Sequence, residues 1–176
     1  MNTRRIIISA FRELLSRQSV GSISVNMIIA TAEISKPTFY RYFYSKYELV
    51  NVVFEEIFSP MQDAAEGTAW RDVLESTLAS LEKSAVIIKN GFRSPEEESL
   101  RDICMRQILE PYVLDMLKGR GVDVRDANVC FSIRAMVLVH VAAFVGWACD
   151  SGRKSRKTVA DQLCASLPSL LVNGMM

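Results

Sequence analysis

The sequence contains a single histidine, His140, and its four cysteines lie far apart, at positions 104, 130, 149 and 164. Zinc sites use closely spaced Cys and His ligands, so these residues do not indicate one. One histidine also leaves little acid–base chemistry, and no nucleophile–base pairing, P-loop or carboxylate dyad with flanking glycines occurs. The sequence therefore does not indicate an enzyme, and we expect neither a metal nor another cofactor.

Signals for export or membrane insertion are also missing. The N-terminus, M-N-T-R-R-I-I-I-S-A, has too short an apolar run for a signal peptide and no cleavage site. The longest charge-free stretch, Ala135 to Cys149, has 15 residues, fewer than the roughly 20 that cross a bilayer. We therefore expect a soluble cytoplasmic protein with no membrane partner, whose cysteines act as small buried hydrophobic residues.

Hydrophobic residues make up 49% of the 176 residues, which excludes a disordered regulator. The formal net charge is only +1, but the charge is unevenly distributed. Residues 1–50 carry seven Lys or Arg and three acidic residues, a net of +4, and the remainder carries 14 basic and 17 acidic residues, a net of −3. A basic N-terminal part on a mildly acidic body suits a phosphate-facing module, although ordinary surface variation would also produce this pattern.

Helical periodicity runs through the whole chain, and no strand alternation or hairpin dipeptide interrupts it. The sequence predicts an all-α fold. Beyond the N-terminal part, the predicted helices run from Ser45 to near Pro60, from Trp70 to Asn90, from the capping sequence Ser94-Pro95-Glu96-Glu97 to Leu117 with a kink or break at Pro111, from Asp126 to Ser151, and from Lys157 to Leu171.

The stretch from Ser24 to Phe43, S-V-N-M-I-I-A-T-A-E-I-S-K-P-T-F-Y-R-Y-F, predicts two short helices joined by a tight turn. Ser24 and Ser35 are natural N-caps, and Pro37 fits the first turn of the second helix. That second helix gathers residues able to meet phosphates and base edges beside two apolar rings, Phe39 and Phe43. This layout is typical of a helix-turn-helix.

The run T-F-Y-R-Y-F followed by S-K-Y-E-L, together with an apolar first-helix pattern from Ile7 to Leu15, resembles the DNA-binding domain of the tetracycline-repressor (TetR) family. The resemblance covers roughly residues 3–54. It implies a three-helix DNA-binding domain over residues 1–48 and a regulatory and dimerisation domain, a helical bundle, over residues 49–176. One departure is Glu33, which stands at a turn position usually held by Gly, so a left-handed backbone there would cost about 1–2 kcal/mol.

Two grounds indicate which residues bind DNA: the chemistry of their side chains and this resemblance. Lys36 and Arg41 can reach guanine O6/N7 or phosphate, and Thr38 can bond phosphate or contact a thymine methyl group. Half-buried packing is an alternative for Tyr40 and Tyr42, and a solvated surface charge is an alternative for Arg41. The resemblance implies DNA contacts for Asn26, Lys36, Pro37, Thr38, Tyr40, Arg41 and Tyr42, and a backbone contact for Lys46.

The body is expected to hold a dimer interface and a ligand pocket. Two apolar C-terminal helices that meet their own copies would form a four-helix interface, with intramolecular burial as the alternative. The interface candidates are Val159, Leu163, Leu167 and Leu170. The pocket candidates are Trp70, Phe92, Met105, Tyr112, Met116, Phe131, Met136, His140 and Trp147. Met and aromatic residues line adaptable cavities, but at helical spacing they also form plain core.

The leading hypothesis is a ligand-responsive homodimeric repressor that binds a near-palindromic operator in double-stranded DNA and responds to a small-molecule effector. A transcriptional activator of the same family is an alternative, as is a protein-interaction module that has lost operator binding. A partner protein in place of a small-molecule effector also stays open. The dimer is favoured because two recognition helices must reach major grooves about 34–36 Å apart.

Overall fold

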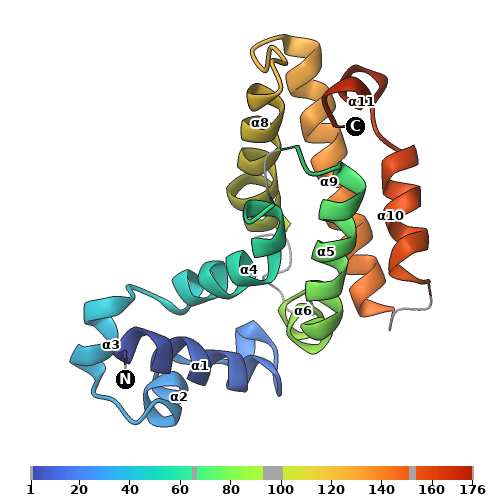
Figure 1. Ribbon diagram of the computed structural model, residues 1–176. Coiled ribbons are helices and arrows are strands. Elements are labelled where there is room, and N and C mark those ends of the chain that lie inside the picture. Colours follow the sequence, from blue (N-terminus) through green and yellow to red (C-terminus); the bar gives the residue numbers. More distant parts are fainter. Residues whose placement is uncertain (1, 65–66, 93–100, 151–153, 176) are drawn as a thin grey trace.

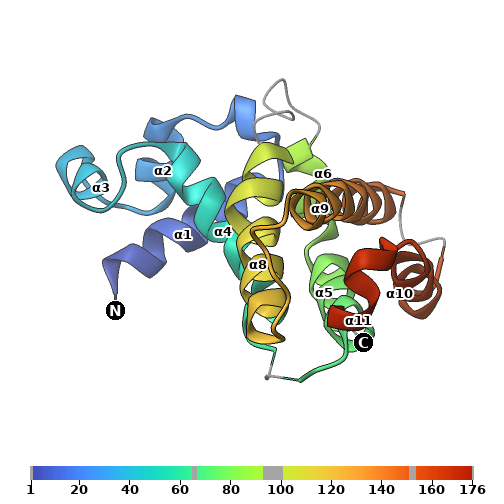
Figure 2. The same ribbon diagram turned by 90° about the horizontal axis from the view of Figure 1, so that it is seen from above.

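The computed structural model describes residues 2–64, 67–92, 101–150 and 154–175, which form helices with no strand among them. The predicted all-α fold is confirmed. Figure 1 shows a small head of helices α1–α3 lying to one side of a taller body, with α4 leading from one into the other. Figure 2, viewed from above, shows the head displaced from the body in the same way.

The head consists of α1 (Thr3–Leu15), the 3₁₀ turn η1 (Val20–Ser22), α2 (Val25–Thr31) and α3 (Lys36–Tyr42). Helix α1 begins at Asn2, whose side chain accepts a hydrogen bond from the Arg4 backbone N–H at 3.0 Å. Its buried face packs with the apolar residues of α2 and α3, and these residues form the head part of one hydrophobic core that continues through α4 into the body: Ile7, Phe11, Leu15, Val20, Ile23, Ile28, Phe39 and Phe43. This core sets the mutual orientation of the three helices.

Helix α4 (Lys46–Gln62) joins the head to the body and continues two residues past the predicted stop at Pro60. Proline removes one N–H donor, but the next residue, Met61, is fully buried, and the Asp63 N–H donates to the Ser59 carbonyl at 2.8 Å. Packing and the following bond hold this last turn helical. The domain boundary proposed between residues 48 and 49 falls inside α4, so the two parts share one helix.

The predicted helix from Trp70 to Asn90 is two helices, α5 (Trp70–Lys83) and α6 (Ala85–Phe92). The break lies at Ser84, where φ is −107° and ψ is 13°. The Ser84 N–H donates to the carbonyls of Ser80 and Leu81, and its own carbonyl accepts from Ile88, so the break leaves these backbone groups satisfied. The apolar pattern continues through this break, which is why periodicity alone did not reveal it.

The predicted break at Pro111 is a change of helix type instead. The chain widens into a π-helical segment, η2 (Ile103–Leu109), and passes directly into α8 (Glu110–Gly119), with Pro111 in the first turn of α8. A wider turn ahead of proline accommodates the missing N–H without ending the helix. The predicted start at Ser94-Pro95-Glu96-Glu97 lies outside the described residues.

The last part of the chain forms α9 (Ala127–Cys149), α10 (Arg156–Ala165) and α11 (Ser169–Met175). Helix α9 begins at the predicted place, and Asp126 caps it by accepting from the backbone N–H groups of Asn128 and Val129 at 2.8 and 3.0 Å. The predicted helix from Lys157 to Leu171 was wrong in its extent, because the chain leaves the helix at Ser166 and restarts after Pro168. Pro168 lacks the N–H that a continuous helix would need there.

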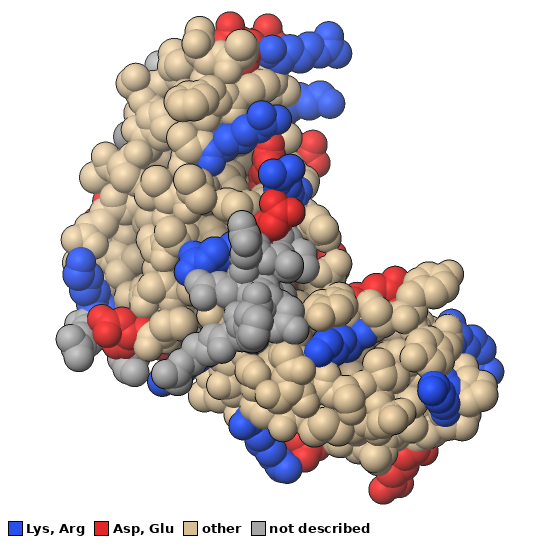
Figure 3. All heavy atoms as spheres, turned by 180° about the vertical axis from the view of Figure 1, so that it is seen from behind, with Lys and Arg blue, Asp and Glu red and all other residues tan. Residues whose placement is uncertain are grey.

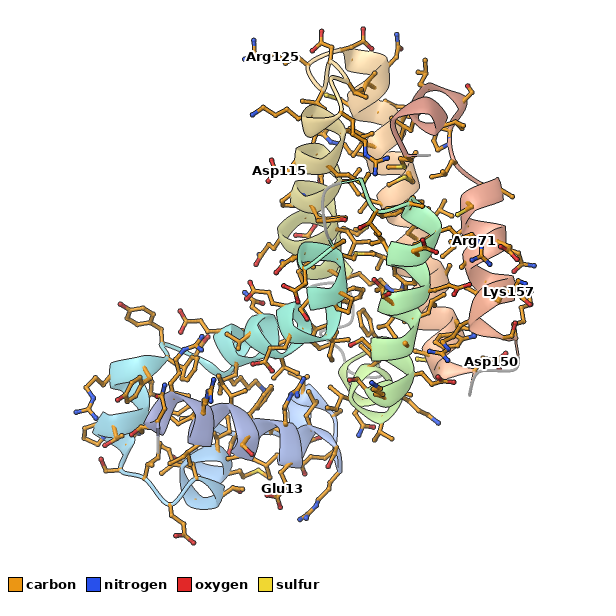
Figure 4. All side chains as sticks on the ribbon, in the orientation of Figure 1. Glu13, Arg71, Asp115, Arg125, Asp150 and Lys157 are labelled. Carbon is orange, nitrogen blue, oxygen red and sulfur yellow. The ribbon has the colours of Figure 1, made fainter. Side chains whose placement is uncertain are left out.

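Helices α5, α9 and α10 pack side by side in the body, and polar contacts support the α5–α10 pair. Arg71 lies between these two helices, donating to Asp161 at 2.8 Å and pairing with Glu75 at 2.9 Å (Figure 4). Val159 and Leu163 of α10 are buried at this contact side of the helix. The inner surface of α10 is therefore occupied within the chain itself.

Helix α9 is long and apolar enough to span a membrane by composition, with a mean hydropathy of 2.0 over its most apolar window. Core helices of soluble bundles pass the same test. In this structure α9 packs against α5, α6, α8 and α11, which bury Ile133, Val137, Val141 and Phe144. Its composition is thus explained in part by burial inside the bundle.

Candidate nucleic-acid interface

Two serine caps define where the helices of the candidate DNA-binding motif begin. The Ser24 hydroxyl accepts from the Met27 backbone N–H at 3.2 Å, and the Ser35 hydroxyl accepts from the Thr38 N–H at 3.2 Å. The Ser35 and Thr38 hydroxyls are also 2.8 Å apart. Pro37 occupies the first turn of α3, where a missing N–H costs little. Both helix starts were readable in the sequence.

The turn between the two helices has the left-handed residue that the sequence suggested. Glu33 has φ of 51°, and among the described residues it is the one non-glycine with positive φ. Its N–H donates to Ala30 O at 3.3 Å, and the Ile34 N–H donates back to Ile29 O at 3.2 Å. This pair of bonds is a Schellman motif, which satisfies the last carbonyls of α2. The left-handed position is confirmed, and it carries a Cβ.

Helix α3 has one buried side that fixes its orientation. Phe39 is fully buried and Phe43, just after the helix, is 3% exposed; their ring centroids are 6.1 Å apart. The Tyr40 ring meets Phe39 edge-on at 5.3 Å. These rings hold α3 against the head core, so its remaining side chains project outward. The exposed set comprises Lys36, Pro37, Tyr40, Arg41 and Tyr42, with Thr38 partly buried.

The tyrosines of this exposed set remain accessible, at 45% for Tyr40 and 37% for Tyr42. The Arg41 guanidinium carbon lies 5.2 Å from the centre of the Tyr42 ring. At this distance the guanidinium is attracted by the ring quadrupole. Asn26 of α2 is exposed as well. The structure thus brings seven of the eight predicted DNA-binding residues onto the accessible surface of α2 and α3.

Lys46 differs from the other predicted contacts. Its ammonium group donates to the backbone carbonyls of Val20 at 2.8 Å and Ile23 at 3.0 Å, with Gly21 at 3.4 Å. An ammonium has three donors, and here three carbonyls of the η1 turn and its C-cap Ile23 surround it. Lys46 therefore ties the start of α4 to the turn that precedes α2. A phosphate contact at Lys46, which the resemblance implied, would have to share or replace these bonds.

Two residues beside α3 were not singled out from the sequence. Tyr44 is 85% exposed, and its backbone N–H donates to the Glu48 carboxylate at 2.6 Å. Arg4 of α1 lies over the Phe43 ring at 5.5 Å. The available signal for Tyr44 was its place directly after Phe43 in F-Y-S-K, where it extends the aromatic run of α3. No local signal joined Arg4 to Phe43, which is 39 residues further along the chain.

Charge on the head is mixed. Figure 3 shows Lys and Arg side chains projecting from several points of the head lobe, with acidic side chains between them. Arg17 pairs with Glu13 at 2.9 Å and Arg12 pairs with Glu56 at 3.4 Å, so part of the basic excess is compensated locally. Lys36 and Arg41 lie on α3 itself. Two of the seven basic residues among residues 1–50 therefore belong to α3, and the others are distributed over the rest of the head.

The body contains a pocket of about 530 Å³ between α8 and the end of α4. Tyr112 and Met116, two of the predicted pocket residues, line it together with Gln62, Thr68 and Arg120. The Arg120 guanidinium donates to the Thr68 carbonyl at 2.9 Å. Trp70 is buried behind this lining and stacks on Tyr112, and His140 is packed against Trp70.

The other predicted pocket residues lie elsewhere in the body. Phe92 is buried against Phe54, with ring centroids 5.6 Å apart, and Met136 is 2% exposed. Met105 lines a second hollow, formed with α9. Phe131 is 75% exposed on α9, and the Trp147 Nε1–H donates to the Lys154 carbonyl at 2.8 Å. The sequence predicted that these residues line one pocket. In the folded body they lie in the core, at a second hollow and on the outer surface of α9.

The predicted interface residues divide in the same way. Val159 and Leu163 are 5% and 4% exposed within the single chain, so they are not available to a second copy in this arrangement. Leu170 of α11 is 55% exposed, and Leu167 is partly buried. Sequence periodicity identified an apolar side of α10, but α5 already covers it.

The chain is similar to known bacterial regulatory proteins, both in the sequence of its N-terminal part and in its fold. The family model for "Bacterial regulatory proteins, tetR family" matches residues 7–53, which contain α2, α3 and the start of α4. A curated relative, the HTH-type dhaKLM operon transcriptional activator DhaS from Lactococcus lactis, is 32% identical over 91 residues. That match covers 51% of this chain and 49% of DhaS, so it spans about half the length of that relative.

Solved structures resemble the chain over nearly its whole length. The dihydroxyacetone kinase operon activator DhaS superposes with a TM-score of 0.66 at 24% identity, covering 94% of this chain and 93% of that one. A TetR transcriptional regulator from Streptococcus agalactiae gives 0.64 at 17% identity, covering 92% and 90%. At these identities the likeness concerns the fold, a helical head joined to a helical body.

Proposed function

The chain belongs to the tetR family of bacterial regulatory proteins and is a transcriptional regulator, and from this premise we propose how it acts. It binds a near-palindromic site in double-stranded DNA as a homodimer, in the cytoplasm, and a small-molecule effector in the body changes its affinity. The protein acts by binding and not as an enzyme. One observation carries the proposal: α3 is held by Phe39 and Phe43 while its polar side chains remain exposed.

Side chains of α3 enter the major groove in this proposal. Lys36 and Arg41 bond guanine edges or phosphates, and Tyr40 and Tyr42 donate from their hydroxyls to phosphates beside the groove. Pro37 and Thr38 meet the DNA at the start of the helix, and Asn26 of α2 reads a further base. For Lys46 we propose a different role, since its ammonium already holds the η1 carbonyls: it positions α2 and α4.

An exposed apolar stripe on α9 supports the homodimer. Phe131, Leu138 and Val139 are 75%, 56% and 49% exposed, at spacings that put them along one side of a helix. Large apolar side chains that line up on a surface mark interaction sites. We propose that two copies of α9 meet through this stripe, with Leu170 of α11 at its edge. This arrangement also accounts for a helix that is apolar nearly all round.

The direction of regulation has two candidates. Repression follows if the operator overlaps the promoter, which is the leading hypothesis from the sequence. Activation is favoured by one observation, the similarity to DhaS, which is described as an operon activator. Either outcome uses the same DNA-binding surface and differs in where the operator lies.

Selection of bound duplexes from the fragmented source genome tests the proposal. Purified protein at near-physiological salt should enrich a near-palindromic site with half-sites about one helical turn apart. The Arg41→Ala variant should lose preference at one base position per half-site, by about 1–3 kcal/mol if Arg41 reads a base. Fusing the enriched site and its promoter to a reporter then gives the sign of regulation. Salt-sensitive, sequence-blind binding alone would contradict the proposal and favour an interaction module.

A further inference from the structure

Two buried rings that pack against each other in the centre of the body each carry a polar atom without a partner. Trp70 is 2% exposed and His140 is fully buried, and their ring centroids are 5.7 Å apart. Neither Trp70 Nε1 nor His140 Nε2 has a hydrogen-bond partner among the described residues. Most buried polar side-chain atoms in proteins are paired, so two exceptions on neighbouring rings need a physical reason.

The hydrogen-bonding roles of these two atoms can be assigned. His140 Nδ1 is 2.8 Å from the Met136 carbonyl oxygen, which can only accept, so Nδ1 carries the hydrogen. Burial lowers the pKa of His140 to about 4, so the ring is neutral near pH 7 and Nε2 is an acceptor. Trp70 Nε1–H is a donor only. The pair therefore presents one donor and one acceptor.

A hydroxyl group matches this pair because a single oxygen atom both accepts and donates. It would accept from Trp70 Nε1–H and donate to His140 Nε2. A carboxylate or phosphate can only accept and would leave the histidine unsatisfied, and an ammonium can only donate. A charged group buried here would also meet rings and an uncharged imidazole instead of an opposite charge, since Phe144 packs edge-on against His140 at 6.1 Å.

The ring of Tyr112 lies between the pocket beside α8 and the Trp70–His140 pair. Tyr112 lines the pocket and stacks on Trp70, with ring centroids 6.3 Å apart and the planes 21° apart. Tyr112 is only partly buried, so its ring can turn when a ligand enters. The lining adds the neutral polar groups of Gln62, Thr68 and Gln107. It also contains two side chains of opposite charge: Asp115, on α8 (Figure 4), and Arg120, whose guanidinium is bonded to the Thr68 carbonyl.

We propose that the pocket and the Trp70–His140 pair form one effector site, and that its ligand is a small, uncharged, hydroxylated molecule. One hydroxyl of the ligand bridges Trp70 Nε1 and His140 Nε2 after the Tyr112 ring turns, and the rest occupies the pocket. The inference rests on the proposed ligand-responsive regulator and specifies the chemical class of its effector and the two atoms that recognise it.

The fluorescence emission of Trp70 reports directly on this site. The chain has two tryptophans, so Trp147→Phe leaves Trp70 as the sole indole emitter. This variant is titrated with neutral polyols from glycerol to sorbitol, with glycerate as the charged analogue and 1,2,3-trimethoxypropane as an analogue that cannot donate. We expect a saturable change in Trp70 emission with at least one polyol and none with the two analogues. No saturable polyol response, or an equal response to either analogue, would overturn the inference.

Variants of the pair separate recognition from packing. His140→Leu removes the acceptor and should weaken polyol binding about tenfold. Phe144→Leu, which touches the same ring but removes no polar atom, should leave the affinity within about twofold of the parent. Equal affinities in the His140→Leu variant and its parent would overturn the assignment. If His140→Leu does not fold, Trp70→Phe removes the donor and keeps a ring, and calorimetry then replaces emission.

Binding of each variant to the selected operator duplex is measured in parallel. Normal DNA binding without a polyol response overturns the effector class and leaves the regulator proposal intact. A polyol response that His140→Leu abolishes, in a protein that binds all duplexes equally, supports the site and contradicts the sequence-specific regulator. The two failures are therefore distinguishable.

Discussion

Individual polar residues in this protein are used in ways that their chemistry alone does not determine. Lys46 resembles a phosphate ligand in sequence, yet its ammonium is surrounded by three carbonyls of the head. His140 resembles a pocket or interface residue, yet it is a fully buried neutral ring with one nitrogen bonded to Met136. Each of these two residues should therefore affect the stability of the protein in a way that an exposed lysine or histidine would not.

Lys46→Ala should lower the free energy of unfolding by about 1–3 kcal/mol, because it leaves the carbonyls of Val20 and Ile23 without their donor. The slope of log affinity for DNA against log salt should change by less than one unit. Lys36→Ala is the matched control: its side chain is exposed, so the slope should fall by about one unit with little change in stability. A full unit lost in Lys46→Ala would restore Lys46 as a phosphate contact.

His140 should make stability depend on pH. Its pKa is about 4 in the folded protein, against an ordinary value of 6.5, so between these pH values the unfolded chain binds a proton that the folded chain does not. The free energy of unfolding should therefore fall as pH drops from about 6.5 to about 4, by up to about 3 kcal/mol. Urea titrations at pH 7.5, 6 and 5 measure it. His140 is the one histidine, so His140→Leu should abolish the part of the slope above pH 5.

At the scale of secondary-structure elements, local capping residues decided where several helices start, and longer-range packing decided where helices continue or break. Ser24, Ser35 and Asp126 cap the helices that follow them. Helix α4 passes through Pro60, and the apolar run after Trp70 breaks at Ser84 without glycine or proline. Capping acts within one turn, whereas continuation through a proline or a break without one depends on contacts with other helices.

The helix-turn-helix turn offers a test at this scale. Glu33 has φ of 51° and carries a Cβ, so Glu33→Gly should be more stable than Glu33→Ala by about 1 kcal/mol. The alanine variant retains the strained Cβ and controls for loss of the carboxylate. Thermal and urea unfolding of the two variants give the difference. Equal stabilities would mean that the Schellman bonds of Ile34 and Glu33 fully offset the strain.

At the scale of the whole molecule, an apolar surface of α9 stays exposed, whereas the apolar side of α10 is buried within the chain. The stripe of Phe131, Leu138 and Val139 is exposed in the single chain, and α5 covers Val159 and Leu163. A charge in the stripe should therefore affect assembly, and a charge in α10 should affect folding.

Leu138→Glu should convert the proposed dimer into monomers in analytical ultracentrifugation and leave the fold intact, because it charges an exposed position in the proposed interface. Val86→Glu on α6 is the control, since Val86 is also 56% exposed but lies outside the stripe. Its sedimentation should match that of the parent. Dimers that persist in Leu138→Glu would place the interface elsewhere, with Leu170 as the next position to charge.

The sequence by itself determined the helical class, the caps of α2 and α3 and the polar side of α3, while the left-handed turn at Glu33 was implied by the family resemblance. These features depend on neighbours within one or two turns, which the local order of residues specifies. Only the tertiary structure decided the carbonyl partners of Lys46, the adjacency of Trp70 and His140, and which apolar stripe stays exposed. Those depend on residues 23–70 positions apart, whose approach is set by how the helices pack and not by any local pattern.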